Sequence, residues 1–284
     1  MDLRSLEIRM ARSENLPTLP QVASQVLKLA DDSDSNPREF EKAVELDPAV
    51  TAKILKIANS AYYGSTNVPT IGRAISFLGL SQVRSVVVGI AMQQMSAGKN
   101  SCANLNKLEL WRHSLAVAIA CRIMGKLKHP GWAEELYCAG MLHEIGMLAM
   151  EKFVPQELHQ AIGRAQSTGT SVNDVSMDVS GFSPSEAGFV LAKSWGLSPI
   201  IQSAIHHWHN PRMDENHYET TAIVAFAKNM ALSLGFNHSG LDKDTTLDLM
   251  LANEIELPEG QFDIIGEVVV NEVGKAQEAF QIAA

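Results

Sequence analysis

Two histidines and a glutamate are the clearest candidates for chemistry in this sequence. His113 shares a predicted helix face with Leu110 and Val117, and His143 likewise lies at helical spacing from apolar residues. Glu144 follows His143 directly. Imidazole and carboxylate groups bind iron, manganese or zinc, and an open coordination position on such an ion activates water. His113, His143 and Glu144 are therefore candidate metal ligands, and hydrogen-bonded core histidines are the alternative.

The surroundings of the other histidines give a weaker indication of a metal site. Four lie among polar or turn residues and are expected to be exposed: His129, His159, His217 and His238. Three more lie close together further along the chain: His206, His207 and His209. The three cysteines are not in CxxC spacing, which favours reduced buried thiols over structural zinc or disulfides. They are Cys102, Cys121 and Cys138.

Helices must position these residues, because apolar residues recur at helical spacing and no segment alternates as a strand does. Asp47 before Pro48 is typical of an N-cap followed by a first-turn proline. Thr70 and Gly79 are predicted to bound a short helix, and Ser81 to begin the next. Longer helices are predicted over residues 107–127, 133–151, 155–168, 184–195, 198–208 and 218–234. The predicted fold class is all-α.

A small, polar segment over residues 96–106 separates two helical parts of the chain. We expect an N-terminal helical subdomain over residues 1–105, packed on a second helical subdomain over 106–240. Residues 241–284 keep helical apolar spacing and are expected to form a C-terminal helical extension.

Composition limits the partners and the compartment. The chain has 284 residues and a net charge of −9, with no block of lysine and arginine. Nucleic-acid and anionic-membrane binding are therefore disfavoured. No signal peptide is recognisable, and no apolar run approaches the ~20 residues of a membrane span. These features predict a soluble, cytoplasmic protein.

Several motifs resemble those of the HDOD domain, a regulatory branch of the HD-domain phosphohydrolase superfamily. In the first part they are residues 16–20 (LPTLP), 47–49 (DPA), 57–64 (IANSAYYG) and 74–79 (AISFLG). In the second part they are residues 111–114 (WRHS), 140–146 (GMLHEIG), 186–188 (EAG) and 195–197 (WGL). The resemblance covers residues 16–235. It implies an all-α fold, an N-terminal subdomain packed on an HD-like subdomain, and a role in bacterial signalling.

The departures from the superfamily's metal-binding pattern are specific. His113 and His143 stand at ligand positions, whereas Glu144 replaces the aspartate of the usual His-Asp doublet. Other ligand positions are lost to Pro184, Trp208 and Lys228. His209 remains from a His-His pair, so the resemblance implies at most a degenerate site of His113, His143, Glu144 and His209. His206 and His207 could substitute only from other helix faces.

Lys228 is the sharpest of these departures, because an ammonium repels a divalent ion in the same pocket. We hypothesise that Lys228 pairs with Glu144 and substitutes for the metal. The alternatives are that Lys228 reaches solvent or binds a phosphate group.

Three functions compete. The ligand losses favour a non-catalytic signal-transduction module that acts through contacts with signalling proteins, with no cofactor. The stretch after the motifs is expected to be too short for a further catalytic domain. The first alternative is a metal-dependent phosphohydrolase with a reduced site holding Fe, Mn or Zn. The second is a nucleotide-sensing domain without turnover, for which Arg112 and Arg122 are candidate contacts.

The IANSAYYG motif has two interpretations. Asn59 and Ser60 end a predicted helix, and Tyr62 and Tyr63 follow before a glycine. A C-cap whose tyrosines pack on the second subdomain is one interpretation. The other is a partner-binding site formed by Asn59, Ser60, Tyr62 and Tyr63.

Overall fold

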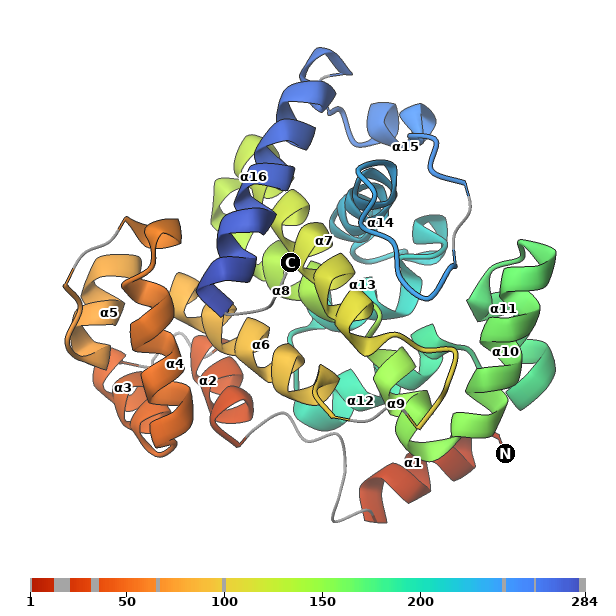
Figure 1. Cartoon of the computed structure of the whole chain (residues 1–284), viewed down its shortest axis with the longest axis horizontal. Helices are drawn as coiled ribbons and strands as arrows, with labels where there is room; N and C mark the ends of the chain where they lie inside the picture. The colour runs from red at the N-terminus through yellow and green to blue at the C-terminus, as the bar shows by residue number, and fades with distance from the viewer. Residues whose placement is uncertain are drawn as a thin grey trace.

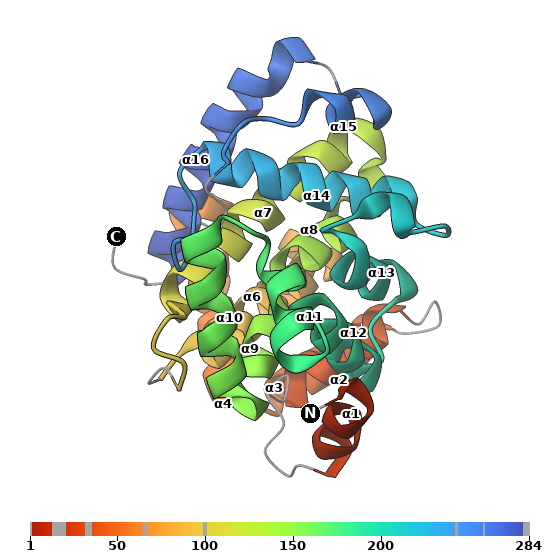
Figure 2. The same ribbon diagram turned by 90° about the vertical axis from the view of Figure 1, so that its right-hand side faces the viewer.

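The structure is a computed structural model, and it confirms the all-α prediction. It describes residues 2–12, 21–31, 36–64, 67–98, 101–241, 244–257 and 259–280, and no strand occurs among them (Figures 1 and 2). Residues 16–20, which carry the LPTLP motif, lie outside this part of the chain. The buried apolar side chains form one cluster that extends through both helical parts.

After residue 20, the described residues of the first part form five short helices and one 3-10 turn. They are α2 (Gln21–Asp31), α3 (Pro37–Glu45), α4 (Pro48–Ala58), η1 (Ala61–Tyr63), α5 (Ile71–Leu78) and α6 (Leu80–Ser96). The predicted caps are confirmed: the Asp47 carboxylate accepts hydrogen bonds from the first turn of α4, and Thr70 accepts one from Arg73. Gly79, at φ 83°, ends α5 and also precedes α6, so α6 begins at Leu80 rather than Ser81.

The second part begins with α7 (Lys107–Lys128), which packs extensively against α8 (Ala133–Leu142). The predicted helix over 133–151 is divided, because α9 (Ile145–Phe153) starts only after His143 and Glu144. Successive side chains on a continuous helix diverge by roughly 100°. The break, with Glu144 at φ −108° and ψ 21°, allows both side chains to face one site.

The other predicted helices of this part begin and end within one residue of their predicted bounds. They are α10 (Pro155–Thr168), α12 (Pro184–Trp195), α13 (Pro199–His207) and α14 (Tyr218–Ser233). The helix α11 (Val172–Ser180) is not among the predicted ones. It contains small polar and β-branched residues, which have modest helix propensity, and it is stabilised by packing on α10.

Three helices remain: α1 (Leu3–Arg12), at the start of the first part, and α15 (Leu249–Glu254) and α16 (Phe262–Phe280), in the C-terminal extension. The first of them packs on α12. The last lies along α7 and also contacts α4 and η1, so it joins the two helical parts (Figure 1). Near its end, the Phe280 ring lies edge-on to Trp111, with the ring centroids 5.5 Å apart.

Gly89 of α6 makes room for the end of α16, and this contact gives a testable prediction. A Cβ atom at Gly89 would lie 2.7 Å from Cζ of Phe280. We expect Gly89→Ala to lower the free energy of unfolding by about 1–2 kcal/mol, since the ring must shift. Gly274→Ala on α16 is the control, because no atom lies within 4 Å of its added methyl group. It should gain up to about 1 kcal/mol. Equal changes in urea unfolding would contradict the contact.

Membrane-spanning character is weak in the described part of the chain. No single helix there is both long and apolar enough to cross a bilayer. The pair α5 and α6 meets both conditions only when taken together, and it is bent by 115°.

Candidate functional site

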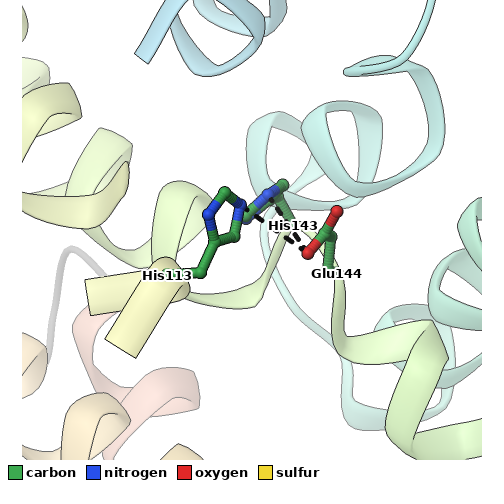
Figure 3. A group of neighbouring side chains, drawn as sticks. All are labelled: His113, His143 and Glu144. Carbon is green, nitrogen blue, oxygen red and sulfur yellow. Dashed lines mark ion pairs between the residues drawn. The ribbon is translucent and has the colours of Figure 1, made fainter. Parts of the chain in front are cut away.

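His113, His143 and Glu144 meet in the core of the second part (Figure 3). His113 lies on α7, His143 follows α8, and the packing of these two helices brings the rings to a centroid separation of 5.4 Å. Oε2 of Glu144 is 3.7 Å from Nε2 of His113 and 3.9 Å from Nε2 of His143. None of the three residues is more than 5% exposed. Together they could hold a metal ion.

Backbone carbonyls orient both imidazole rings. Nδ1 of His113 lies 2.7 Å from the carbonyl oxygen of Phe236, and Nδ1 of His143 lies 2.7 Å from that of Gly140. Since a carbonyl only accepts, each Nδ1 carries the proton, and a neutral ring then has a lone pair on Nε2. The Nε2 atoms of His113 and His143 are buried without a hydrogen-bond partner among the described residues, and Oε2 of Glu144 faces both of them. Such a group of acceptors attracts a cation.

The structure places one such cation beside Glu144. Nζ of Lys228 lies 3.9 Å from Oε1 of Glu144, and both side chains are almost completely buried. The contact that we hypothesised between these residues is therefore present. The ammonium also lies 4.8 Å from the ring centroid of Trp208, whose ring in turn is 5.3 Å from that of His143. Two positions that the resemblance marks as lost ligands thus help to enclose the site.

His238 also reaches Glu144, and the expectation that it is exposed is wrong. It is 1% exposed, and its Nε2 lies 2.8 Å from Oε2 of Glu144. The loop after α14 is fixed by two hydrogen bonds that hold His238 in this position. The backbone N–H of Ser239 donates to Oε2 of Glu109 on α7, and the backbone N–H of Asn106 donates to the Ser239 hydroxyl. No periodicity marks a loop residue as buried, so local sequence carries no signal for His238.

Burial and neighbouring side chains shift the pKa values of the histidines and the glutamate in this cluster. Burial lowers the pKa of His113 well below its usual value and that of His143 to about 4, so both rings are neutral at pH 7. Burial alone would raise the pKa of Glu144, but the facing histidines, His238 foremost, outweigh it. The pKa of Glu144 therefore lies well below its usual range, and the carboxylate is ionised.

The structure does not bring His209 to this group. Its Nδ1 lies 3.1 Å from the hydroxyl of Ser185 on α12, and its ligand atoms are not among those that converge with His113 and Glu144. The neighbouring His206 stacks on Phe189 instead, at a centroid distance of 4.4 Å. Pro184, the other lost ligand position, is the first residue of α12, and its carbonyl faces Gly146.

Side chains of the IANSAYYG motif make hydrogen bonds to other residues of the chain. The Asn59 amide group exchanges two hydrogen bonds with the backbone of Val68 and donates a third to Leu55. The Tyr62 hydroxyl accepts a hydrogen bond of 3.1 Å from Arg122, whose guanidinium also bonds Glu134 at 2.8 Å. These contacts connect the motif to α7 and α8, which matches the interpretation as a helix end packed on the second part. A partner-binding role for Asn59, Ser60, Tyr62 and Tyr63 stays a prediction.

The HDOD domain family matches residues 16–211, which is most of the chain. The chain belongs to the HDOD domain family. Lys228, Phe236 and His238, which surround Glu144 and His113, lie beyond the matched residues.

Solved structures share the fold at low sequence identity. An HDOD domain protein of unknown function from Geobacter sulfurreducens is 24% identical, with a TM-score of 0.77 over 98% of this chain and 96% of its own. A "putative phosphohydrolase" from Shewanella amazonensis is also 24% identical, with a TM-score of 0.75 over 98% and 97%. A "putative signal transduction protein" from Marinobacter aquaeolei is 18% identical, with a TM-score of 0.77 over 98% and 65%.

One curated relative also matches. An uncharacterized protein of Treponema pallidum (strain Nichols) is 21% identical over 221 residues, which are 76% of this chain and 42% of that protein. The chain thus spans about two fifths of the relative's length.

Proposed function

We propose that this chain is a non-catalytic signal-transduction module that acts through protein contacts. One observation carries the proposal: Lys228 and His238 approach the two carboxylate oxygens of Glu144, at 3.9 Å and 2.8 Å. At an effective dielectric of about 20, an ammonium about 4 Å from a divalent ion opposes it by roughly 8 kcal/mol. An internal cation therefore stabilises the carboxylate in the place where a metal would otherwise do so.

A metal-dependent phosphohydrolase is the second candidate, and the imidazole orientation favours it. His113 and His143 would hold the ion through Nε2, and Glu144 through a carboxylate oxygen. Such an ion would supply a Lewis acid and an activated water molecule. The residues fit a metal in donor type, but Lys228 must then turn away from Glu144 or bind the substrate's phosphate group.

The nucleotide-sensing alternative loses one of its candidate contacts. The Arg122 guanidinium is buried, bonds Tyr62 and Glu134, and lies 3.9 Å from the ring centroid of Tyr137. The Arg122 side chain therefore contributes to the contact between the two helical parts.

Metal content distinguishes the first two candidates. We expect the wild-type chain, purified without chelator, to hold well under one equivalent of iron, manganese or zinc. Lys228→Asp should raise divalent-ion affinity by about tenfold or more, since it removes a repulsive charge and adds a ligand. Lys228→Met is the matched control, which removes the charge alone and should give a smaller gain. Elemental analysis and calorimetric titration measure both effects.

One result would decide for the phosphohydrolase. This result is a stoichiometric metal ion in the wild-type chain, together with turnover of bis-(p-nitrophenyl) phosphate that His143→Ala abolishes.

A further inference from the structure

An open apolar groove lies between α14 and α16. Figures 1 and 2 show where these two helices lie in the fold. The volume of the groove is about 640 Å³. Met230 lines it from α14, Leu234 from the residue directly after α14, and Phe262 and Val270 from α16. Val270 is 46% exposed although it is apolar. The groove therefore has an apolar surface that no described residue covers completely.

A glycine keeps this groove open. Gly266 lies on the α16 wall between Phe262 and Val270, and a Cβ atom there would already be 3.1 Å from Cδ2 of Leu234. A larger side chain at this position would have to enter the groove or displace Leu234.

The rim of the groove is acidic. Asp263 and Glu267 stand one helical turn apart on α16, and both are exposed. Leu247, in the segment between α14 and α15, also lines the groove. The lining residues include no lysine, arginine or histidine. Both charged residues that line the groove are therefore acidic, in a chain whose net charge is −9.

We propose that this groove binds an amphipathic helix of a partner protein, with leucine-like residues on one face and lysine or arginine beside them. A helix can place its apolar face in such a groove at i, i+3, i+4 and i+7 spacing. Basic residues beside that face would pair with Asp263 and Glu267 and accelerate association. A second copy of this chain fits less well, because two acidic surfaces repel each other. The inference rests on the proposed role in protein contacts and names the partner's chemistry.

The test uses the full chain and a labelled synthetic leucine–lysine helix as the probe. Fluorescence anisotropy should show binding at one peptide per chain, weakened by salt. The corresponding leucine–glutamate peptide should bind at least about tenfold more weakly. Glu267→Lys should weaken the basic peptide about tenfold, whereas Glu278→Lys, the same charge change further along α16, should change it much less.

A second pair of variants tests the apolar floor. Val270→Arg should abolish peptide binding, and Met177→Arg should not, although both residues are 46% exposed. Circular dichroism and thermal unfolding confirm that each variant is folded.

Three results would overturn the inference. They are binding unaffected by Glu267→Lys and Val270→Arg, equal binding of the acidic peptide, and a chain dimer that Val270→Arg dissociates. The dimer would assign the groove to a second copy. Metal-dependent turnover with intact peptide binding would instead refute the proposed function alone, so the two failures remain distinguishable.

Discussion

Glu144→Gln is expected to lower the free energy of unfolding by about 3–5 kcal/mol. The substitution keeps the shape of the side chain but removes its charge. It leaves the buried Lys228 ammonium without the negative charge that lies 3.9 Å away, and it gives His238 an uncharged acceptor in its 2.8 Å contact. Removing one partner of a buried ion pair costs more than the pair itself contributes, because the remaining charge stays desolvated. Urea unfolding at pH 7 measures the loss.

Adding Lys228→Met to Glu144→Gln shows whether the effects of the two charges on the free energy of unfolding depend on each other. We expect the double variant, Glu144→Gln with Lys228→Met, to be more stable than Glu144→Gln alone, since no buried ammonium then remains at this position. Lys107→Met is the matched control: its ammonium is also buried, but it lies 3.4 Å from Glu151. Its effect should simply add to that of Glu144→Gln. Additive effects for both lysines would mean that Lys228 does not replace a metal charge.

Gly146→Ala is expected to lower the free energy of unfolding by about 3 kcal/mol or more. A Cβ atom at this position would lie 1.7 Å from the carbonyl oxygen of Pro184 and 2.7 Å from the amide nitrogen of Gly188. These are backbone atoms of α12, so no side chain can rotate away, and α9 must separate from α12. Because Glu144 directly precedes α9, the same shift should also disturb its contact with Lys228.

Gly131→Ala provides the comparison for this variant. Gly131 has no atom within 4 Å of the added methyl group, and a change within about 0.5 kcal/mol is expected. Chemical denaturation of both variants measures the difference. An alanine at 146 that left stability unchanged would show that α9 and α12 approach each other less closely than in this structure.

Local sequence predicted most of the helices, because their ends depend on neighbouring residues. Asp47 and Thr70 accept hydrogen bonds from the next turn, and Gly79 adopts a positive φ that other residues disfavour. Apolar spacing likewise placed His113 and His143 on buried faces. The contact between Lys228 and Glu144 followed only from the resemblance to the family, since 84 positions separate them in the chain.

Tertiary structure alone decided how the cluster is completed. The helix break at His143 and Glu144 arises where α9 meets α12 through Gly146, and a helical pattern does not show it. His238 enters the core because hydrogen bonds from Ser239 and Asn106 hold its loop against α7. The sequence by itself determined an all-α fold and a histidine–carboxylate core. Which groups neutralise that core depended on contacts between distant segments, since electrostatic interactions follow distance in space rather than order along the chain.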